Sequence, residues 1–299
     1  MIFRLLLMLS AACAVAQVQE CTRTLPVNVV DRATGRSVDS FTADQLHARV
    51  GSLPLTISSL DKFAAGRVLV LIDVSGSMEH VSTLVKHLGP ALVRENPSGA
   101  QIAFGFFNSR IVISPQFTAD PRELDRIIEQ ANATPSKGRT LLLDAIHQGL
   151  KLFGEPRLGD SMLIVTDGDD NDSVIRRRRI EDEVKAAGVR MFSVLMKRPF
   201  SSGSAEIQEG EERLDRMAKN TGGAVYTIPV GGPEWRDPEF KQHLNDALLI
   251  LWRESVLQGY SVTLKTPSVI KKGQWKLEIT HDDRPEIHYP QYLGPCSLP

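Results

Sequence analysis

The sequence predicts an α/β fold: a doubly wound, mostly parallel sheet covered by helices, with small flanking β segments from both ends of the chain. Two uninterrupted apolar runs, at residues 68–72 and 162–165, and a largely apolar segment at 191–195 are typical of strands that are buried on both faces. A stretch with helical character follows each run, and repeated strand–helix units favour a parallel sheet. The 299 residues, 42% hydrophobic and 24% charged, have the composition of a globular chain.

Residues 1–16 are typical of a secretory signal peptide. A short apolar stretch is followed by Ala-Val-Ala at residues 14–16, a cleavage pattern that predicts a mature chain starting at Gln17. The apolar stretch is far shorter than the ~20 residues of a membrane span, and no other segment is apolar enough to cross a bilayer. Lipid anchoring at Cys13 is the weaker interpretation, because Ser10 stands where a lipobox has a branched apolar residue. We therefore expect an exported protein, either periplasmic or secreted.

Two cysteines remain after the predicted cleavage, Cys21 and Cys296, one near each end of the mature chain. Exported proteins fold in oxidising compartments, and chain ends often lie close together in compact folds. We expect an intramolecular Cys21–Cys296 disulfide, with two free thiols as the alternative.

The rest of the chain divides by its pattern into three parts. Residues 17–62 and 258–299 contain short strand-like segments and are expected to pack together, whereas residues 63–257 form the α/β domain. In that domain a hairpin is expected over residues 102–113 and another parallel strand at 224–228. The expected helices cover residues 78–94, 121–131, 141–153, 175–187, 210–220 and 238–257.

The charge balance excludes one class of partner. Lys and Arg number 35 against 36 Asp and Glu, a formal net charge of −1. Such a balance gives no electrostatic reason to bind nucleic acid.

Oxygen-bearing side chains follow the two most apolar strands and precede one helix. Asp73, Ser75 and Ser77 follow the first strand in an Asp-x-Ser-x-Ser pattern, Asp167 follows the strand at 162–165, and Thr140 stands at or near the start of the helix at 141–153. Ligands of open α/β sheets bind beyond the carboxyl ends of the strands, so we expect these side chains to meet there. Carboxylates and hydroxyls are hard ligands suited to Mg²⁺, with Mn²⁺ or Ca²⁺ as alternatives.

This set of residues, in this order, resembles the metal-ion-dependent adhesion site (MIDAS) of von Willebrand factor type A (VWA) domains. The resemblance covers roughly residues 63–257 and extends, in its flanking β segments, to secreted bacterial VWFA-related proteins. It implies a Rossmann-like domain that binds a protein ligand through a divalent cation. It further implies that Ser75 and Ser77 bind the metal directly, that Thr140 joins in a high-affinity state, and that Asp73 and Asp167 act largely through water.

The resemblance implies a non-enzymatic, adhesion-type module whose partner presents an Asp or Glu. A structural or assembly subunit whose ion only stabilises the fold is an alternative, and a metal-dependent hydrolase is a less favoured one, because the loops offer no clear general base apart from His80. Two further clusters have unspecific interpretations. Residues 169–172 are expected to be solvated loop acids and a helix cap, with a second Ca²⁺ site as the alternative. Residues 176–179 are expected to form a solvated basic face, with pairing to the preceding acids or attraction of an acidic partner as alternatives.

Overall fold

The computed structural model describes residues 20–132, 138–197, 205–230, 232, 237–271, 273–294 and 296. The predicted signal peptide at residues 1–16 lies outside them. None of the helices in this described part of the chain has the length and apolar character needed to cross a bilayer.

The central sheet confirms the predicted fold class. Its strand order is β10–β9–β8–β5–β6–β7, and every neighbouring pair is parallel except β6 with β7. The apolar runs of the sequence form its middle, where β5 and β8 are buried along their whole length. The strands are β5 (Arg67–Asp73), β6 (Gln101–Phe107), β7 (Ile111–Ile113), β8 (Ser161–Thr166), β9 (Arg190–Lys197) and β10 (Val225–Pro229).

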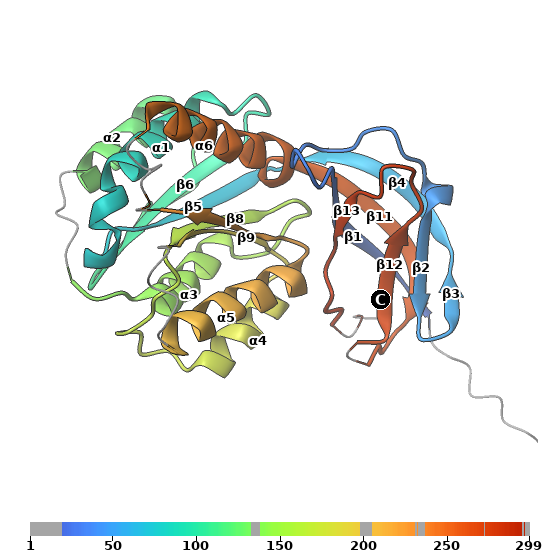
Figure 1. Ribbon diagram of the computed structural model, residues 1–299. Helices are drawn as coiled ribbons and strands as arrows, with labels where there is room; N and C mark the ends of the chain where they lie inside the picture. The colour runs from blue at the N-terminus through green and yellow to red at the C-terminus, as the bar shows by residue number, and fades with distance from the viewer. Residues whose placement is uncertain are drawn as a thin grey trace, which may run out of the picture.

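Helices cover both faces of this sheet (Figure 1). One layer contains α1 (Ser82–Arg94), α2 (Pro121–Asn132) and α6 (Pro238–Leu251), and the other contains α3 (Leu142–Phe153), α4 (Arg177–Ala186) and α5 (Ala205–Thr221). Successive side chains of a strand point to opposite faces. Val68 and Val70 therefore pack against the helices of the first layer, while Leu69 and Leu71 pack against those of the second.

Two of the predicted helices are not regular along their whole length. The segment expected to be helical from Met78 begins as a 3-10 turn, η2 (Gly76–Val81), before α1. The helix expected over 238–257 ends as α6 at Leu251 and continues as a π turn, η4 (Trp252–Val256). The Trp252 ring is fully buried and its Nε1 donates to the Glu95 carbonyl at 2.7 Å, which fixes this turn beside the end of α1.

A separate β module is built from both ends of the chain (Figure 1). One sheet has the order β13–β1–β11–β4 and the other β12–β2–β3, with an apolar core between them. The strands are β1 (Glu20–Val30), β2 (Leu46–Val50), β3 (Leu53–Leu55), β4 (Ile57–Ala64), β11 (Gln258–Pro267), β12 (Trp275–Ile279) and β13 (Glu286–His288); a short 3-10 helix, η1 (Ala43–Gln45), precedes β2. The predicted Cys21–Cys296 disulfide is present, with Cα atoms 6.5 Å apart across 275 residues of sequence.

Arg190, at the start of β9, ties the module to the α/β domain. Its guanidinium is buried and donates to Asn28 Oδ1 at 2.7 Å, Ser161 Oγ at 2.8 Å and the Val256 carbonyl at 2.9 Å. It also lies 4.9 Å from the centre of the Phe63 ring. Burial lowers the pKa of Arg190 to about 9, so it stays protonated at neutral pH and its charge is shared among oxygens of both parts.

Candidate metal centre

Asp73 is the last residue of β5 and lies at the carboxyl end of the central sheet. Its side chain is fully buried, and both oxygens are held: Oδ1 accepts the Ser75 N–H at 2.8 Å, and Oδ2 accepts the Thr166 hydroxyl at 2.7 Å. Thr166 is the last residue of β8, so the two central strands fix this carboxylate between them. This hydrogen bond depends on the pairing of β5 with β8, which the position of Thr166 in the sequence does not reveal.

Ser75 and Ser77 lie in the turn after β5 with their hydroxyl oxygens 3.0 Å apart. Ser75 is buried and Ser77 is half-buried. The Gly76 N–H between them donates to the Gly138 carbonyl at 3.2 Å, which joins this turn to the loop that carries Thr140. Gly138 has φ +92°, and a Cβ there would stand 2.8 Å from Ser109 Oγ, so this close approach requires glycine.

Thr140 is buried in the loop just before α3. Its N–H donates to Asn171 Oδ1 at 2.9 Å, and its carbonyl accepts the N–H groups of Asn171 and Asp172 at 3.2 and 3.1 Å. Leu141, not Thr140, occupies the N-cap position of α3, without a side-chain hydrogen bond to the helix. Asn171 therefore positions Thr140 from a third loop, a role that its sequence position among acidic residues did not reveal.

Asp167 directly follows β8 and is half-buried. Burial, and then the nearby charge of Asp167, raise the pKa of Asp73 to about 7. Two carboxylates with this mutual repulsion favour a cation beside them. The described residues hold no group of three or more His, Cys, Asp or Glu side chains suited to one metal ion, so a cation here would depend on the hydroxyl oxygens as well. That mixed oxygen set fits a hard divalent ion.

Gly210 of α5 supports the loop that follows Asp167. A Cβ added to Gly210 would lie 2.2 Å from the carbonyl oxygen of Gly168, closer than any side chain can approach. The helix therefore packs directly against the backbone of this loop. No pattern in the sequence connects Gly210, 43 residues beyond Asp167, with the site.

A pocket of about 400 Å³ opens beside the same loop. Its lining includes three arginines, Arg139, Arg177 and Arg213, and three aspartates at positions 169, 170 and 172. Arg139 pairs with Asp172 at 3.3 Å. Asp170 accepts the Leu143 N–H in the first turn of α3 at 3.4 Å, so two of the loop acids contact the segments around Thr140.

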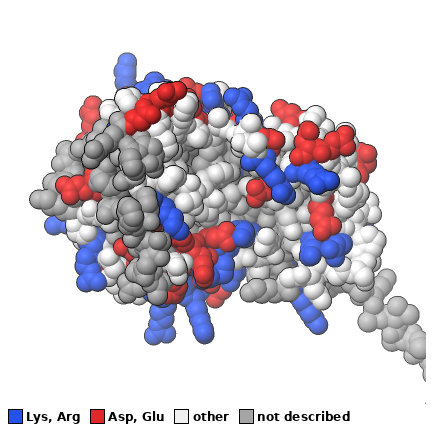
Figure 2. Space-filling view, in the orientation of Figure 1, with Lys and Arg blue, Asp and Glu red and all other residues white. Residues whose placement is uncertain are grey.

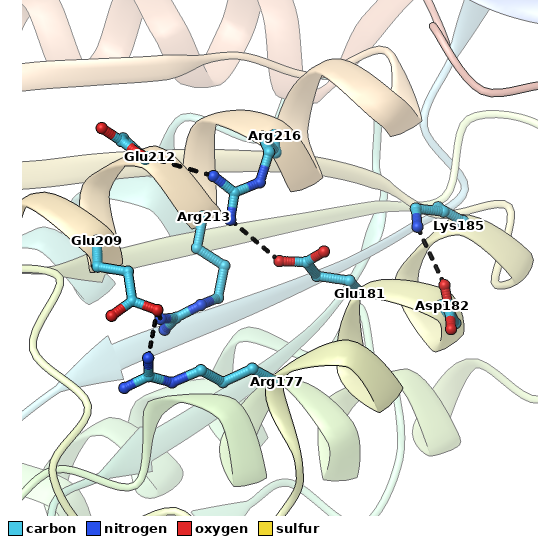
Figure 3. Close-up of polar contacts among 8 residues, drawn as sticks. All are labelled: Arg177, Glu181, Asp182, Lys185, Glu209, Glu212, Arg213 and Arg216. Carbon is cyan, nitrogen blue, oxygen red and sulfur yellow. Dashed lines mark hydrogen bonds and ion pairs between the residues drawn. The ribbon is translucent and has the colours of Figure 1, made fainter. Parts of the chain in front are cut away.

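All four arginines of the basic run 176–179 are exposed, and two of them, Arg177 and Arg179, pair with acids of the helices. Arg177 forms an ion pair with Glu209 of α5, and Arg216 of α5 reaches back to Glu181 of α4 at 3.2 Å (Figure 3). Charges of both signs are also interspersed on the face of the molecule in Figure 2. Arg177 therefore takes part in a contact between α4 and α5, in which charges of both signs are paired. The side chain of His80 lies outside what the structure describes.

A family model of VWA domain containing CoxE-like proteins matches residues 47–219. No protein of curated function matches the sequence. Among solved structures, a von Willebrand factor type A protein from Catenulispora acidiphila is similar in fold: TM-score 0.50 and 12% identity, over 90% of this chain and 71% of that one.

Two further structures match less well. BatB from Bacteroides thetaiotaomicron has a TM-score of 0.44 and 15% identity, with 61% of this chain and 96% of that chain covered. Proximal thread matrix protein 1 of the mussel byssus, solved with a zinc-occupied MIDAS motif, has a TM-score of 0.48 and 14% identity, with 70% and 49% covered.

Proposed function

The chain belongs to the family of VWA domain containing CoxE-like proteins, whose model matches more than half of it, and we propose that it is an exported, metal-dependent module that binds a partner protein through an acidic side chain. It is a binding module and not an enzyme in this proposal. The metal residues proposed are Asp73, Ser75, Ser77, Thr140 and Asp167.

The observation that supports the proposal most is the environment of Asp73. A carboxylate that is fully buried beside a second carboxylate, with a pKa raised to about 7, is costly to keep ionised without a positive charge nearby. The hydroxyls of Ser75 and Ser77 lie on the same loop, 3.0 Å apart. A divalent cation, Mg²⁺ in our proposal, supplies that charge and attracts a carboxylate of the partner.

The chain's own residues have distinct tasks in this scheme. Ser75 and Ser77 would hold the ion with neutral oxygens, which leaves its charge largely uncancelled. Asp73 and Asp167 would act mainly through water, and the Thr166 and Ser75 hydrogen bonds keep the Asp73 carboxylate in one orientation. Thr140 is held through its backbone by Asn171, which leaves its hydroxyl available to the ion.

Export is proposed from the sequence and is supported by the disulfide. A Cys21–Cys296 bond is expected to persist in an oxidising compartment and to be reduced in the cytosol. Residues 1–16 would be removed, and residues 17–62 and 258–299 would flank the VWA domain at 63–257.

The proposal is tested by replacing Ser75. We expect Ser75→Ala to lose Mg²⁺ binding in isothermal titration calorimetry, because it removes one direct ligand from a buried position while it leaves the sheet intact. Ser98→Ala, an exposed serine after α1, is the matched control. Circular dichroism should be unchanged in both variants.

Partner capture gives a second readout. Crosslinking in extracts of the exported fraction should recover a protein with Mg²⁺ and lose it with EDTA. Unchanged Mg²⁺ affinity in Ser75→Ala, or capture that persists in excess EDTA, would contradict the proposal.

A further inference from the structure

A second cleft lies at the opposite end of the α/β sheet from the candidate metal centre. It has a volume of about 570 Å³ and runs between β1 and the chain segment that follows β13. Its floor is formed by residues 156–159, Gly188 and the end of α5, all of which precede strands of the central sheet. The metal residues follow strands of that sheet, so the two sites are at different ends.

The cleft is held open by fixed contacts at both ends. At one end β13 pairs with β1, through Asn28–His288 to Val30–Glu286, and at the other the disulfide joins Cys21 to Cys296. Between these points the tail after β13 bends away from β1. The Gln291 N–H donates to the Lys219 carbonyl at 2.9 Å, which ties the tail to the end of α5.

This bend leaves one edge of β1 open. Residues 20–27 of β1 pair with β11 on one side, and in the described part of the chain nothing pairs with them on the other. In an antiparallel ladder, alternate residues direct their N–H and C=O groups away from the partner strand. Residues 23–26 of this edge line the cleft, so the backbone groups there that do not pair with β11 face it; Pro26 has no N–H and can offer only its carbonyl.

The charged side chains that line the cleft all carry positive charge. They are Arg23, Arg157 and Lys185, and no Asp or Glu is among the described lining residues. Arg23 donates to neutral oxygens, Thr266 Oγ1 at 2.8 Å and the Ser268 carbonyl at 3.3 Å. In the described part of the chain the guanidinium of Arg157 has no hydrogen bond or ion pair. Only Lys185 has a carboxylate partner, the exposed Asp182 at 3.0 Å.

Apolar side chains complete the lining. Leu25 and Leu293 are buried at its sides, whereas Leu158 is 46% and Tyr292 is 38% exposed. A concave site between two parts of a chain, lined mostly by apolar groups with a few polar ones, is typical of ligand pockets. The open strand edge favours a ligand that has a peptide backbone of its own.

We propose that this cleft binds a short extended peptide segment of another protein, which adds as a strand to the open edge of β1. Its backbone pairs with β1, an apolar side chain contacts Leu158 and Tyr292, and a carboxylate lies near Arg157 and Arg23. This site works without a metal ion, and it is separate from the MIDAS-type site proposed above.

The test uses the disulfide-intact chain in EDTA, so that the metal centre cannot contribute. The probe is a fluorescein-labelled peptide of alternating Val and Thr that carries two Glu residues, and its control peptide has Gln in their place. We expect saturable binding of the Glu peptide in fluorescence anisotropy and at least about tenfold weaker binding of the Gln peptide. Amide hydrogen exchange should slow in residues 22–27.

Variants locate the binding. Arg157→Glu should weaken the Glu peptide about tenfold, because an exposed attraction becomes a repulsion, while Arg126→Glu on α2 is the matched control and should have no effect. The double variant Cys21→Ser/Cys296→Ser releases one end of the cleft and should also reduce binding. Absence of saturable binding, equal binding of the two peptides, or an unchanged affinity in Arg157→Glu would overturn the proposal.

Discussion

Replacing Asp73 with asparagine should stabilise the metal-free protein at about pH 8, and saturating Mg²⁺ should remove this advantage. In the folded chain without metal the pKa of this carboxyl is raised to about 7, because of burial and then the charge of Asp167, while its ordinary value is 3.8. The unfolded chain therefore releases this proton near pH 3.8, whereas the folded chain holds it until about pH 7. The contribution of Asp73 to the free energy of unfolding of the metal-free protein therefore falls as the pH rises between these two values, and the comparison with Asp73→Asn isolates it.

The size of the effect follows from the shift. Each pKa unit corresponds to about 1.4 kcal/mol, so the shift from 3.8 to about 7 corresponds to about 4 kcal/mol lost above pH 7. The asparagine side chain of the variant would carry no charge and would keep an oxygen for the Ser75 N–H. It would weaken the bond from Thr166, at a cost of about 1 kcal/mol. In EDTA at about pH 8 we expect Asp73→Asn to be more stable than the wild type by about 3 kcal/mol, and at about pH 4 to be slightly less stable.

Metal should remove this advantage. Saturation with Mg²⁺ at about 100 times its dissociation constant stabilises the wild type by about 2.7 kcal/mol and leaves the variant unchanged. Urea unfolding followed by circular dichroism, over a pH series with and without Mg²⁺, measures both effects. A stability difference between the two proteins in EDTA that does not depend on pH, or a lower stability of Asp73→Asn in EDTA at about pH 8, would refute this prediction.

Three other substitutions test the packing around the sites. Arg67→Ala removes the cationic partner of Asp160, whose carboxylate is fully buried and accepts from Arg67 Nε at 3.0 Å. We expect the free energy of unfolding, measured in urea, to fall by about 3–5 kcal/mol. A fall of under about 1 kcal/mol would contradict the stabilising role of this pair. Cys21→Ser/Cys296→Ser opens a loop of 275 residues. Under oxidising conditions the free energy of unfolding of this variant should be about 5 kcal/mol lower than that of the wild type. Equal stability would show that the bond does not constrain the unfolded chain. Gly210→Ala drives a methyl group into the loop after Asp167. The Mg²⁺ affinity should fall, and the free energy of unfolding should fall by about 1–3 kcal/mol. If the variant binds Mg²⁺ in calorimetry as tightly as the wild type, this loop shifts without consequence for the ion.

The sequence predicted the parts of the molecule that depend on local pattern. The runs at 68–72 and 162–165 are apolar at every position, which only a strand covered on both faces can bury, and they are the fully buried strands β5 and β8. The Cys21–Cys296 pairing was also predictable, since few cysteines remain once residues 1–16 are set aside. Helix ends were harder, because the 3-10 turn at Gly76 and the π turn at Trp252 depend on contacts outside the segment.

The candidate site shows the same division. The sequence determined which side chains can offer oxygens to a cation, because Asp73, Ser75 and Ser77 share one loop with a recognisable spacing. Only the tertiary structure decided what holds them: Thr166 on Asp73, Asn171 on Thr140 and Gly210 against the loop after Asp167. It also decided that β1 and the tail after β13 separate to leave the second cleft. The two segments are joined at one end of the cleft by the pairing of β1 with β13 and at the other by the disulfide. Residue type fixes the chemistry that a position offers, whereas contacts between distant segments depend on how helices and strands pack, which no local pattern encodes.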